Sequence, residues 1–182
     1  MKNVLIISAS PAKDGNTDLL SAEFKKGAEE AGNSVEQVFL RQKNIGYCRA
    51  YNYYKRPETS GVCAFKDDMA DLMDRFRAAD VIVLASPVCY YSVNAQMKTF
   101  IDRTYADFMN LTDKEFYFIL SCADPGKESI DAAVNTLRGF TVCLKGAKEM
   151  GIVYGVNAPA HGSIKVLKAM NEAYEMGRNI GR

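Results

Sequence analysis

Residues Val81–Ser92 read VIVLASPVCYYS, so an uninterrupted apolar run leads directly into a turn of small and aromatic residues. The run Val81-Ile82-Val83-Leu84 shows no alternation of apolar and polar positions. Such a run is typical of a strand that is buried on both faces, as the central strands of parallel sheets are. Val4–Ile7, VLII, repeats the pattern near the start of the sequence. The two runs predict an α/β fold built on a parallel sheet.

Strands and helices alternate along the rest of the chain. Helices are indicated by apolar residues at spacings of three and four, such as Leu20, Phe24 and Ala28. The predicted strands are Asn3–Ser8, Ser34–Leu40, Val81–Ser86, Phe116–Ser121 and Ile152–Val156. The predicted helices include Leu20–Ala31 and Met69–Phe76, and then span about 93–108, 128–145 and 163–182. A chain of 182 residues, 48% hydrophobic and 25% charged, predicts a single domain over residues 1–182.

Charge and cysteine content narrow the class of function. The formal net charge is +1, with Lys and Arg scattered among Asp and Glu, which argues against a nucleic-acid partner. The apolar segments are too short for a signal peptide core or a membrane span. The cysteines number five, an odd count, so free thiols in a reducing compartment are expected. We therefore expect a cytoplasmic protein with no membrane partner.

The loop Ser8–Thr17, SASPAKDGNT, leads from the first strand into the first helix. At that place a parallel sheet presents backbone N–H groups of a turn and of a helix N-terminus, which bind phosphate. The hydroxyls of Ser8, Ser10 and Thr17 can add donors, although the same residues can also serve only as a turn and a helix cap. The Gly-x-Gly-x-x-Gly of dinucleotide sites and the Gly-Lys-Ser/Thr of a P-loop do not occur here. The loop is therefore a phosphate site of another kind or a plain turn.

The turn after the third strand offers a second half of a site. In a sheet of order 2-1-3-4-5 the first and third strands flank the topological switch point, so their loops line one crevice. Pro87 stiffens the turn, and Tyr90 and Tyr91 suit a flat heteroaromatic ring, which needs stacking area. Asp102 and Arg103, farther along the next helix, are interpreted as helix-surface or subunit contacts.

Both loops, together with Ala95–Arg103, AQMKTFIDR, resemble the NADPH-dependent FMN reductase superfamily of flavodoxin-like proteins, close to the iron-sulfur flavoproteins and their relatives without clusters. The resemblance implies a three-layer sandwich: a five-stranded parallel sheet in the order 2-1-3-4-5 with helices on both faces. It also implies FMN as cofactor and NAD(P)H as co-substrate. The residues it assigns to the FMN phosphate are Ser8, Ser10, Lys13, Asn16 and Thr17. Those it assigns to the ring, largely through backbone atoms, are Pro87, Val88, Cys89, Tyr90, Tyr91 and Ser92, with Ser121, Cys122 and Ala123 as a third wall.

The activity implied by the resemblance is that of an FMN-dependent oxidoreductase, which accepts hydride from NAD(P)H and reduces a quinone-like, nitroaromatic or similar small acceptor. A flavodoxin-type electron carrier and a non-catalytic flavin-binding regulatory protein are the alternatives. Flavin supplies the reaction and needs no protein acid or base for hydride transfer, so no catalytic residue is assigned. The only histidine, His161, is interpreted as a surface or structural residue. Because the family assembles across helices beside the flavin, a homodimer or homotetramer is expected.

The connection 41–66 is far longer than the roughly 2–6 residues usual between a strand and a helix. Iron-sulfur flavoproteins carry Cys-x-x-Cys-x-x-Cys and a fourth cysteine in this loop, because a [4Fe-4S] cluster needs four thiolates. Here Cys48 and Cys63 are present, whereas Tyr51 and Tyr54 stand at the intervening cysteine positions. A phenol with a pKa of about 10 does not readily replace a thiolate. We predict no iron-sulfur cluster, no other metal site, and buried thiols at Cys48 and Cys63.

Overall fold

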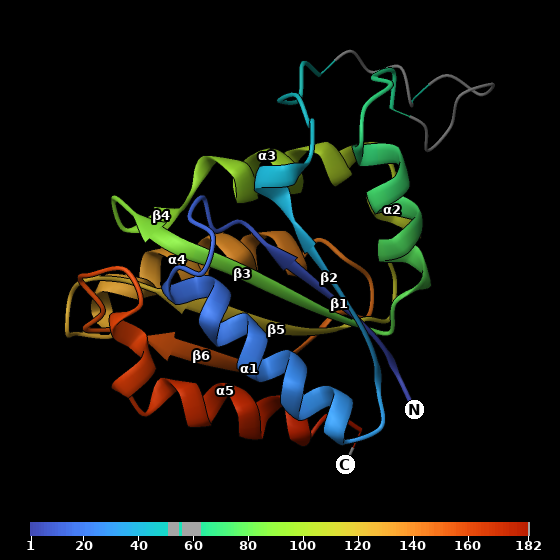
Figure 1. Ribbon diagram of the computed structural model, residues 1–182. Coiled ribbons are helices and arrows are strands. Elements are labelled where there is room, and N and C mark those ends of the chain that lie inside the picture. Colours follow the sequence, from blue (N-terminus) through green and yellow to red (C-terminus); the bar gives the residue numbers. More distant parts are fainter. Residues whose placement is uncertain (51–54, 56–62, 182) are drawn as a thin grey trace.

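The computed structural model describes residues 1–50, 55 and 63–181. Its parallel strands are β1 (Asn3–Ser8), β2 (Ser34–Phe39), β3 (Val81–Cys89), β5 (Glu115–Ser121) and β6 (Lys148–Gly155). They lie in the order β2-β1-β3-β5-β6 (Figure 1), which confirms the predicted parallel sheet of order 2-1-3-4-5. A further strand, β4 (Ser92–Val93), pairs antiparallel with the end of β3 and was not predicted.

Helices cover both faces of this sheet and complete the three predicted layers (Figure 1). One face packs against α1 (Asn16–Glu30) and α5 (Ala169–Arg178), and the other against α2 (Met69–Ala78), α3 (Ala95–Arg103) and α4 (Glu128–Thr141). Two separate cores result, one on each side of the strands.

Alternate residues of each central strand enter different cores. In β1, Val4 and Ile6 pack under α1 and α5, while Leu5 and Ile7 pack under the helices of the other face. Successive side chains of a strand point to opposite faces, so a strand covered on both sides carries apolar residues at consecutive positions. Full burial of one such side chain stabilises the fold by about 1.5–3 kcal/mol. This is the physical origin of the unbroken apolar runs in the sequence.

Two glycines allow α1 and α5 to touch backbone to backbone. A Cβ atom added at Gly177 in α5 would lie 2.1 Å from the Phe24 carbonyl oxygen of α1. One added at Gly27 in α1 would lie 2.1 Å from the Tyr174 carbonyl oxygen of α5. No other residue fits at either position without moving a helix.

Three predicted helices are too long. The helix expected over 93–108 ends at Arg103, where the Thr104 hydroxyl bonds to the Ile101 carbonyl and short 3-10 turns follow. The helix expected to reach residue 145 ends at Thr141. The last helix begins at Ala169, because Leu167 is extended and interrupts the helical path after a 3-10 turn. At the first two of these helix ends, the hydroxyls of Thr104 and Thr141 bond to the carbonyls of Ile101 and Arg138, and such side-chain bonds compete with helix hydrogen bonds.

The described part of the long connection is fastened to α3 by a buried ion pair. The Arg103 guanidinium donates to both carboxylate oxygens of Asp67, at 2.6 and 2.9 Å, and to the Gly46 carbonyl at 2.7 Å. The Arg103 and Asp67 side chains are only 1% and 11% exposed. The interpretation of Arg103 as a helix-surface contact was therefore wrong, because the chain around Gly46 and Asp67 folds back over the end of α3.

The thiol predictions for this connection are corrected in part. Cys48 is exposed rather than buried, and Cys63 is half-buried beside Arg103. Tyr51 and Tyr54, on which the cluster prediction depends, lie outside the described residues. Among the described residues, no group of three or more His, Cys, Asp and Glu side chains is placed to hold a metal ion. Within the same residues, none of the helices is both long and apolar enough to cross a membrane.

Candidate active site

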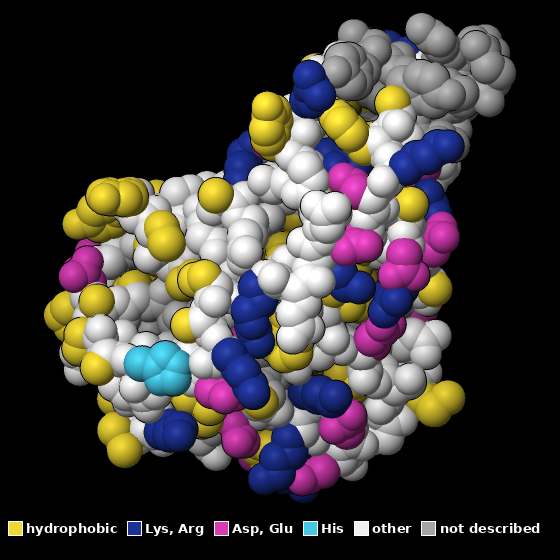
Figure 2. Space-filling model, turned by 45° about the horizontal axis from the view of Figure 1, so that its top comes forward, with side chains coloured by type: hydrophobic (Ala, Val, Ile, Leu, Met, Phe, Trp, Pro, Cys, Tyr) yellow, Lys and Arg dark blue, Asp and Glu magenta, His cyan; other side chains and the backbone are white. Residues whose placement is uncertain are grey.

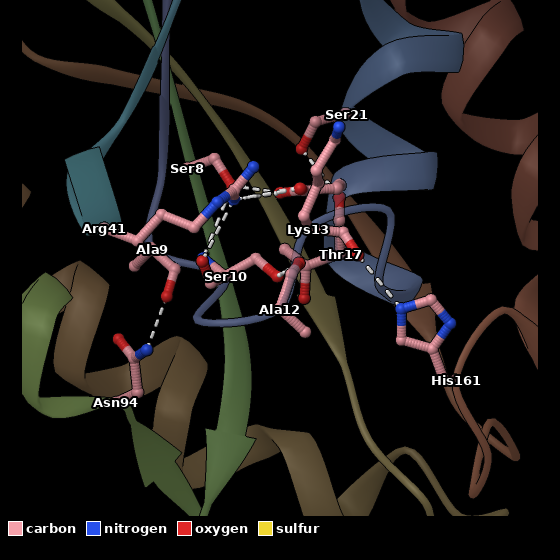
Figure 3. Close-up of polar contacts among 11 residues, drawn as sticks. Ser8, Ala9, Ser10, Ala12, Lys13, Thr17, Ser21, Arg41, Asn94 and His161 are labelled. Atoms are coloured by element: carbon pink, nitrogen blue, oxygen red, sulfur yellow. Dashed lines mark hydrogen bonds and ion pairs between the residues drawn. The ribbon is translucent and has the colours of Figure 1, made fainter.

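The loop 8–17 lies where the carboxyl ends of the parallel strands meet. Side chains tie it to Arg41 after β2 and to Asn94 after the β3–β4 hairpin (Figure 3), and also to the end of β5 and the loop after β6. The Arg41 guanidinium donates to the Ser10 carbonyl at 3.1 Å, and the Asn94 amide donates to the Ala9 carbonyl at 2.5 Å. The Thr17 and Ser121 hydroxyls bond to each other at 2.7 Å. The Asn16 amide donates to the Ala158 carbonyl at 2.9 Å. The sequence-predicted loops are thus brought to one place.

The N-terminus of α1 is open toward this loop. Its N-cap residue is Gly15, which has no side chain to accept hydrogen bonds from the first helical N–H groups. A Cβ at Gly15 would stand 3.2 Å from the Ala12 carbonyl oxygen, so the loop curls tightly around the helix start. Unsatisfied N–H groups and the positive end of the helix dipole make such a terminus a binding site for anions.

Most of the predicted phosphate side chains are engaged within the protein. Ser8 and Thr17 are buried, and their hydroxyls bond to Asp18 (2.9 Å) and Ser121 (2.7 Å). The Ser10 hydroxyl donates to the Ala12 carbonyl at 2.8 Å. The Asn16 side chain bonds to the backbone of the loop after β6, and Lys13 is exposed. These side chains hold the loop in shape. The groups that we propose to bind a ligand are the unengaged backbone N–H groups of the loop and the exposed Lys13 side chain.

The predicted ring-binding turn is a tight hairpin between β3 and β4. Cys89 pairs with Ser92, so Tyr90 and Tyr91 are the two turn residues, and both have positive φ, 49° and 61°. Tyr90 is fully exposed and Tyr91 is 61% exposed. Turns of this geometry normally contain Asn or Gly, because a Cβ is strained at positive φ. The turn conformation is strained, and it leaves the side chains of Tyr90 and Tyr91 exposed at the tip of the hairpin.

Tyr91→Gly is expected to raise the free energy of unfolding by roughly 0.5–1 kcal/mol. Removing the Cβ relieves about 1–2 kcal/mol of strain, and the flexible glycine in the unfolded chain offsets about 0.4–1 kcal/mol of that gain. Urea unfolding followed by circular dichroism measures the difference. A loss of stability would show that the Tyr91 ring makes contacts in solution that outweigh the strain.

Asn94 is a site residue that sequence reasoning missed. It is the N-cap of α3 and accepts from the Met97 N–H at 3.1 Å, while its amide donates to Ala9 in the first loop. Its own N–H donates to the Ser86 hydroxyl at 3.1 Å. One side chain therefore fixes the start of α3 against both predicted halves of the site. An asparagine just before an amphipathic run is a known cap signal and could have identified it.

Arg41 and Asp18 were also missed. Arg41 follows β2, and its guanidinium pairs with Asp18 in the first turn of α1 at 2.9 Å. Asp18 in turn accepts from the Ser8 hydroxyl. No local pattern links an arginine to an aspartate 23 positions away, so only the fold reveals the pair.

The third predicted wall, the segment after β5, lies beside the first loop. Ser121 is buried and bonds to Thr17, Cys122 is half-buried, and Ala123 is exposed. Burial raises the pKa of the Cys122 thiol above its usual value, and the thiol donates to the Asp124 carbonyl at 3.3 Å. The Cys122 thiol is therefore neutral and weakly polar at neutral pH.

His161 lies on the exposed surface next to the first loop (Figures 2 and 3). Its Nε2 atom is 3.0 Å from the Lys13 carbonyl oxygen. The segment after β6 thus touches the first loop through both His161 and Asn16. This contact agrees with the interpretation of His161 as a structural surface residue.

Comparison with known proteins gives the family context. A family model described as NADPH-dependent FMN reductase matches residues 2–156. An iron-sulfur flavoprotein of Archaeoglobus fulgidus is 41% identical over 103 residues, which cover 57% of this chain and 45% of that protein. The chain spans about half the length of the curated iron-sulfur flavoproteins it matches.

Solved structures share the fold at low sequence identity. An NAD(P)H:quinone oxidoreductase from Methanothermobacter marburgensis has a TM-score of 0.75 and 16% identity, with 100% of this chain and 96% of that chain covered. An FMN-dependent NADH-azoreductase from Bacillus anthracis, in complex with FMN, has a TM-score of 0.74 and 15% identity over the full length of both chains. The family match spans both predicted loops and five parallel strands, and we conclude that this chain belongs to the NADPH-dependent FMN reductase family.

Proposed function

We propose that the protein is an FMN-dependent oxidoreductase that takes electrons from NAD(P)H and reduces a small acceptor of the quinone or nitroaromatic type. The observation that carries this proposal is the convergence of a tightly curled loop, an open helix N-terminus and an exposed aromatic hairpin at one edge of the sheet. In doubly wound sheets, ligands bind at this edge, at the point where the strand order reverses. Family membership supports the same assignment.

The residues at this edge fit FMN. The loop 10–16 and the first N–H groups of α1 suit its terminal phosphate, with Lys13 as an exposed cation. In our proposal the segment Pro87–Ser92 lines the ring, and Ser121, Cys122 and Ala123 stand on its other side. Bound FMN supplies the electron-transfer chemistry, and the chain's own residues bind it, orient it and limit access to it.

The surface fits a small-molecule acceptor. Lys and Arg side chains are mixed with Asp and Glu on the face shown in Figure 2, which is unlike the basic stripe of a nucleic-acid binder. The two exposed tyrosines offer stacking area to a flat aromatic acceptor. We extend the proposal to a cytoplasmic location, on the free cysteines, and to a homodimer or homotetramer, which static light scattering of the flavin-loaded protein tests.

The absence of an iron-sulfur cluster stays part of the proposal. It rests on the tyrosines at positions 51 and 54, where a cluster would need cysteine. Anaerobic purification followed by iron and sulfide analysis tests it, and stoichiometric iron and sulfide would overturn it. In the electron path that we propose, FMN is then the last carrier before the acceptor.

The proposed function is tested by FMN titration and turnover of the purified protein. We expect quenching of FMN fluorescence on binding, and oxidation of NADH or NADPH that depends on added quinone. Gly15→Val should weaken FMN binding about tenfold, because its side chain crowds the Ala12 carbonyl and the helix N-terminus. Gly139→Val is the matched control, since an added Cβ there has no described atom within 4 Å apart from the neighbouring backbone of its own helix.

The outcomes of that experiment distinguish the enzyme from its alternatives. A wild type that does not quench FMN fluorescence contradicts the proposed function. Binding of FMN without oxidation of either nicotinamide would favour the electron carrier over the enzyme.

A further inference from the structure

Asp18 stands in an unusual place for a protein that binds an anion at a helix N-terminus. It is the third residue of α1, and its side chain is only 8% exposed. A carboxylate in the first turn of a helix is attracted by the same N–H groups and dipole as a phosphate would be. A buried carboxylate also repels a phosphate dianion strongly, because little water screens the two charges. Asp18 alone would therefore oppose the binding of FMN at this loop.

Arg41 resolves this conflict. Its guanidinium lies 2.9 Å from one Asp18 oxygen and 3.2 Å from the other, and it also donates to the Ser10 carbonyl at 3.1 Å (Figure 3). The side chain is 15% exposed and stacks on the Phe39 ring, with 4.2 Å between the guanidinium carbon and the ring centroid. The guanidinium thus neutralises the carboxylate and holds the loop backbone at Ser10 in the same geometry.

We propose that Arg41 and Asp18 are a positioning pair that sets the preference of this site for FMN over riboflavin, which lacks the phosphate. The pair touches the loop at Ser8 and Ser10, and Asp18 belongs to the first turn of α1, where we propose that the phosphate binds. Its effect therefore falls on the phosphate end of the ligand. This inference rests on the proposed function, since it presupposes that FMN binds at this loop.

Because Arg41 and Asp18 carry opposite charges, replacing one or the other should change the ratio of FMN affinity to riboflavin affinity in opposite directions. Arg41→Gln leaves the Asp18 carboxylate uncompensated and should lower the ratio of FMN affinity to riboflavin affinity at least about tenfold. Asp18→Asn leaves the guanidinium positive beside the phosphate and should raise this ratio. The double variant restores neutrality, and its ratio should return to within about threefold of the wild type. Arg41→Lys keeps the charge and should retain most of the ratio.

The experiment is a titration of each variant with FMN and with riboflavin, alongside its thermal unfolding. Arg138→Gln is the matched control, because Arg138 pairs with Glu149 on the exposed surface near the opposite edge of the sheet. This control should leave the ratio unchanged. If Arg41→Gln does not fold, Asp18→Asn decides: a raised ratio of FMN to riboflavin affinity supports the pair, and an unaltered ratio overturns it.

Failure of the two proposals can be told apart. A wild type that binds no FMN overturns the proposed function and this inference together. If the wild type binds FMN but Arg41→Gln has the same ratio of FMN affinity to riboflavin affinity, only the inference about the pair is overturned. Equal weakening of FMN and riboflavin in Arg41→Gln also overturns it, because such a loss reports a structural role without any effect specific to the phosphate.

Discussion

Replacing Asp67 with alanine is expected to lower the free energy of unfolding by about 3–5 kcal/mol, because it leaves the buried guanidinium of Arg103 without its counter-ion. Asp67 also accepts from the backbone N–H groups of Gly46 (3.1 Å) and Met69 (3.2 Å). Its removal therefore loosens the connection around Gly46 and the start of α2, and leaves the hydrogen bond from Arg103 to the Gly46 carbonyl in place. Urea unfolding at pH 7 measures the loss.

The stability lost on replacing Asp67 with alanine should become smaller as the pH falls. Burial pushes the pKa of Asp67 up, but hydrogen bonds from Arg103, Gly46 and Met69 outweigh burial and hold it below its ordinary value. A carboxyl whose pKa is lower in the folded state stabilises the fold above its unfolded pKa, and this contribution is lost as the pH falls through the folded value. The difference between wild type and Asp67→Ala should therefore be full at pH 7 and shrink below about pH 4.

Asp102→Ala is the control for this prediction. Asp102 pairs with Lys98 on the same helix as Arg103, but its side chain is 43% exposed, and an exposed pair contributes about 0–1 kcal/mol. A loss within about 1 kcal/mol for Asp67→Ala, or a difference that does not change between pH 7 and pH 3, would contradict the assigned role of the pair.

The same substitution, glycine to alanine, should have opposite effects at two helix positions. At Gly177 the new Cβ would lie 2.1 Å from the Phe24 carbonyl oxygen, so α1 or α5 must move, at a cost of about 1–3 kcal/mol or more. At Gly139 in α4, a new Cβ would have no described atom within 4 Å apart from the neighbouring backbone of its own helix, and alanine should stabilise the helix by about 1 kcal/mol.

Thermal unfolding of both variants, with hydrogen exchange of α1 and α5, tests this prediction. We expect a lower melting temperature and faster exchange in α5 for Gly177→Ala only. Equal melting temperatures for the two variants would mean that the helices separate without cost, and that the close approach at Gly177 is not required.

Much of the fold could be predicted from local pattern. The central strands are covered on both faces, so their sequences are unbroken apolar runs, and Val4–Ile7 and Val81–Leu84 showed this directly. The hairpin strand Ser92–Val93 has only two residues, too few to show any periodicity. The start of β6 was missed because Lys148 and Glu149 are charged, which an edge strand tolerates.

The candidate site could be predicted only as far as its loops. Their positions follow from the order of the strands, and a turn rich in serine and glycine before a helix suggests an anion site. The contacts of Arg103 and Arg41 could not be predicted, because their partners lie 36 and 23 residues away along the chain. An arginine at a helix end is usually solvated, and only the path of the long connection makes Arg103 a core residue.

The bonds of Asn16 cross the boundary of the region that defines the family. The family model ends at residue 156, one position beyond β6, whereas Asn16 bonds to the backbone of Ala158, Ala160 and Ile164. A protein cut at that boundary would keep every parallel strand and lose the outer brace of its first loop, together with α5. Residues beyond the family match thus hold the first loop in place, and a change among them can reach the proposed phosphate site without altering any strand.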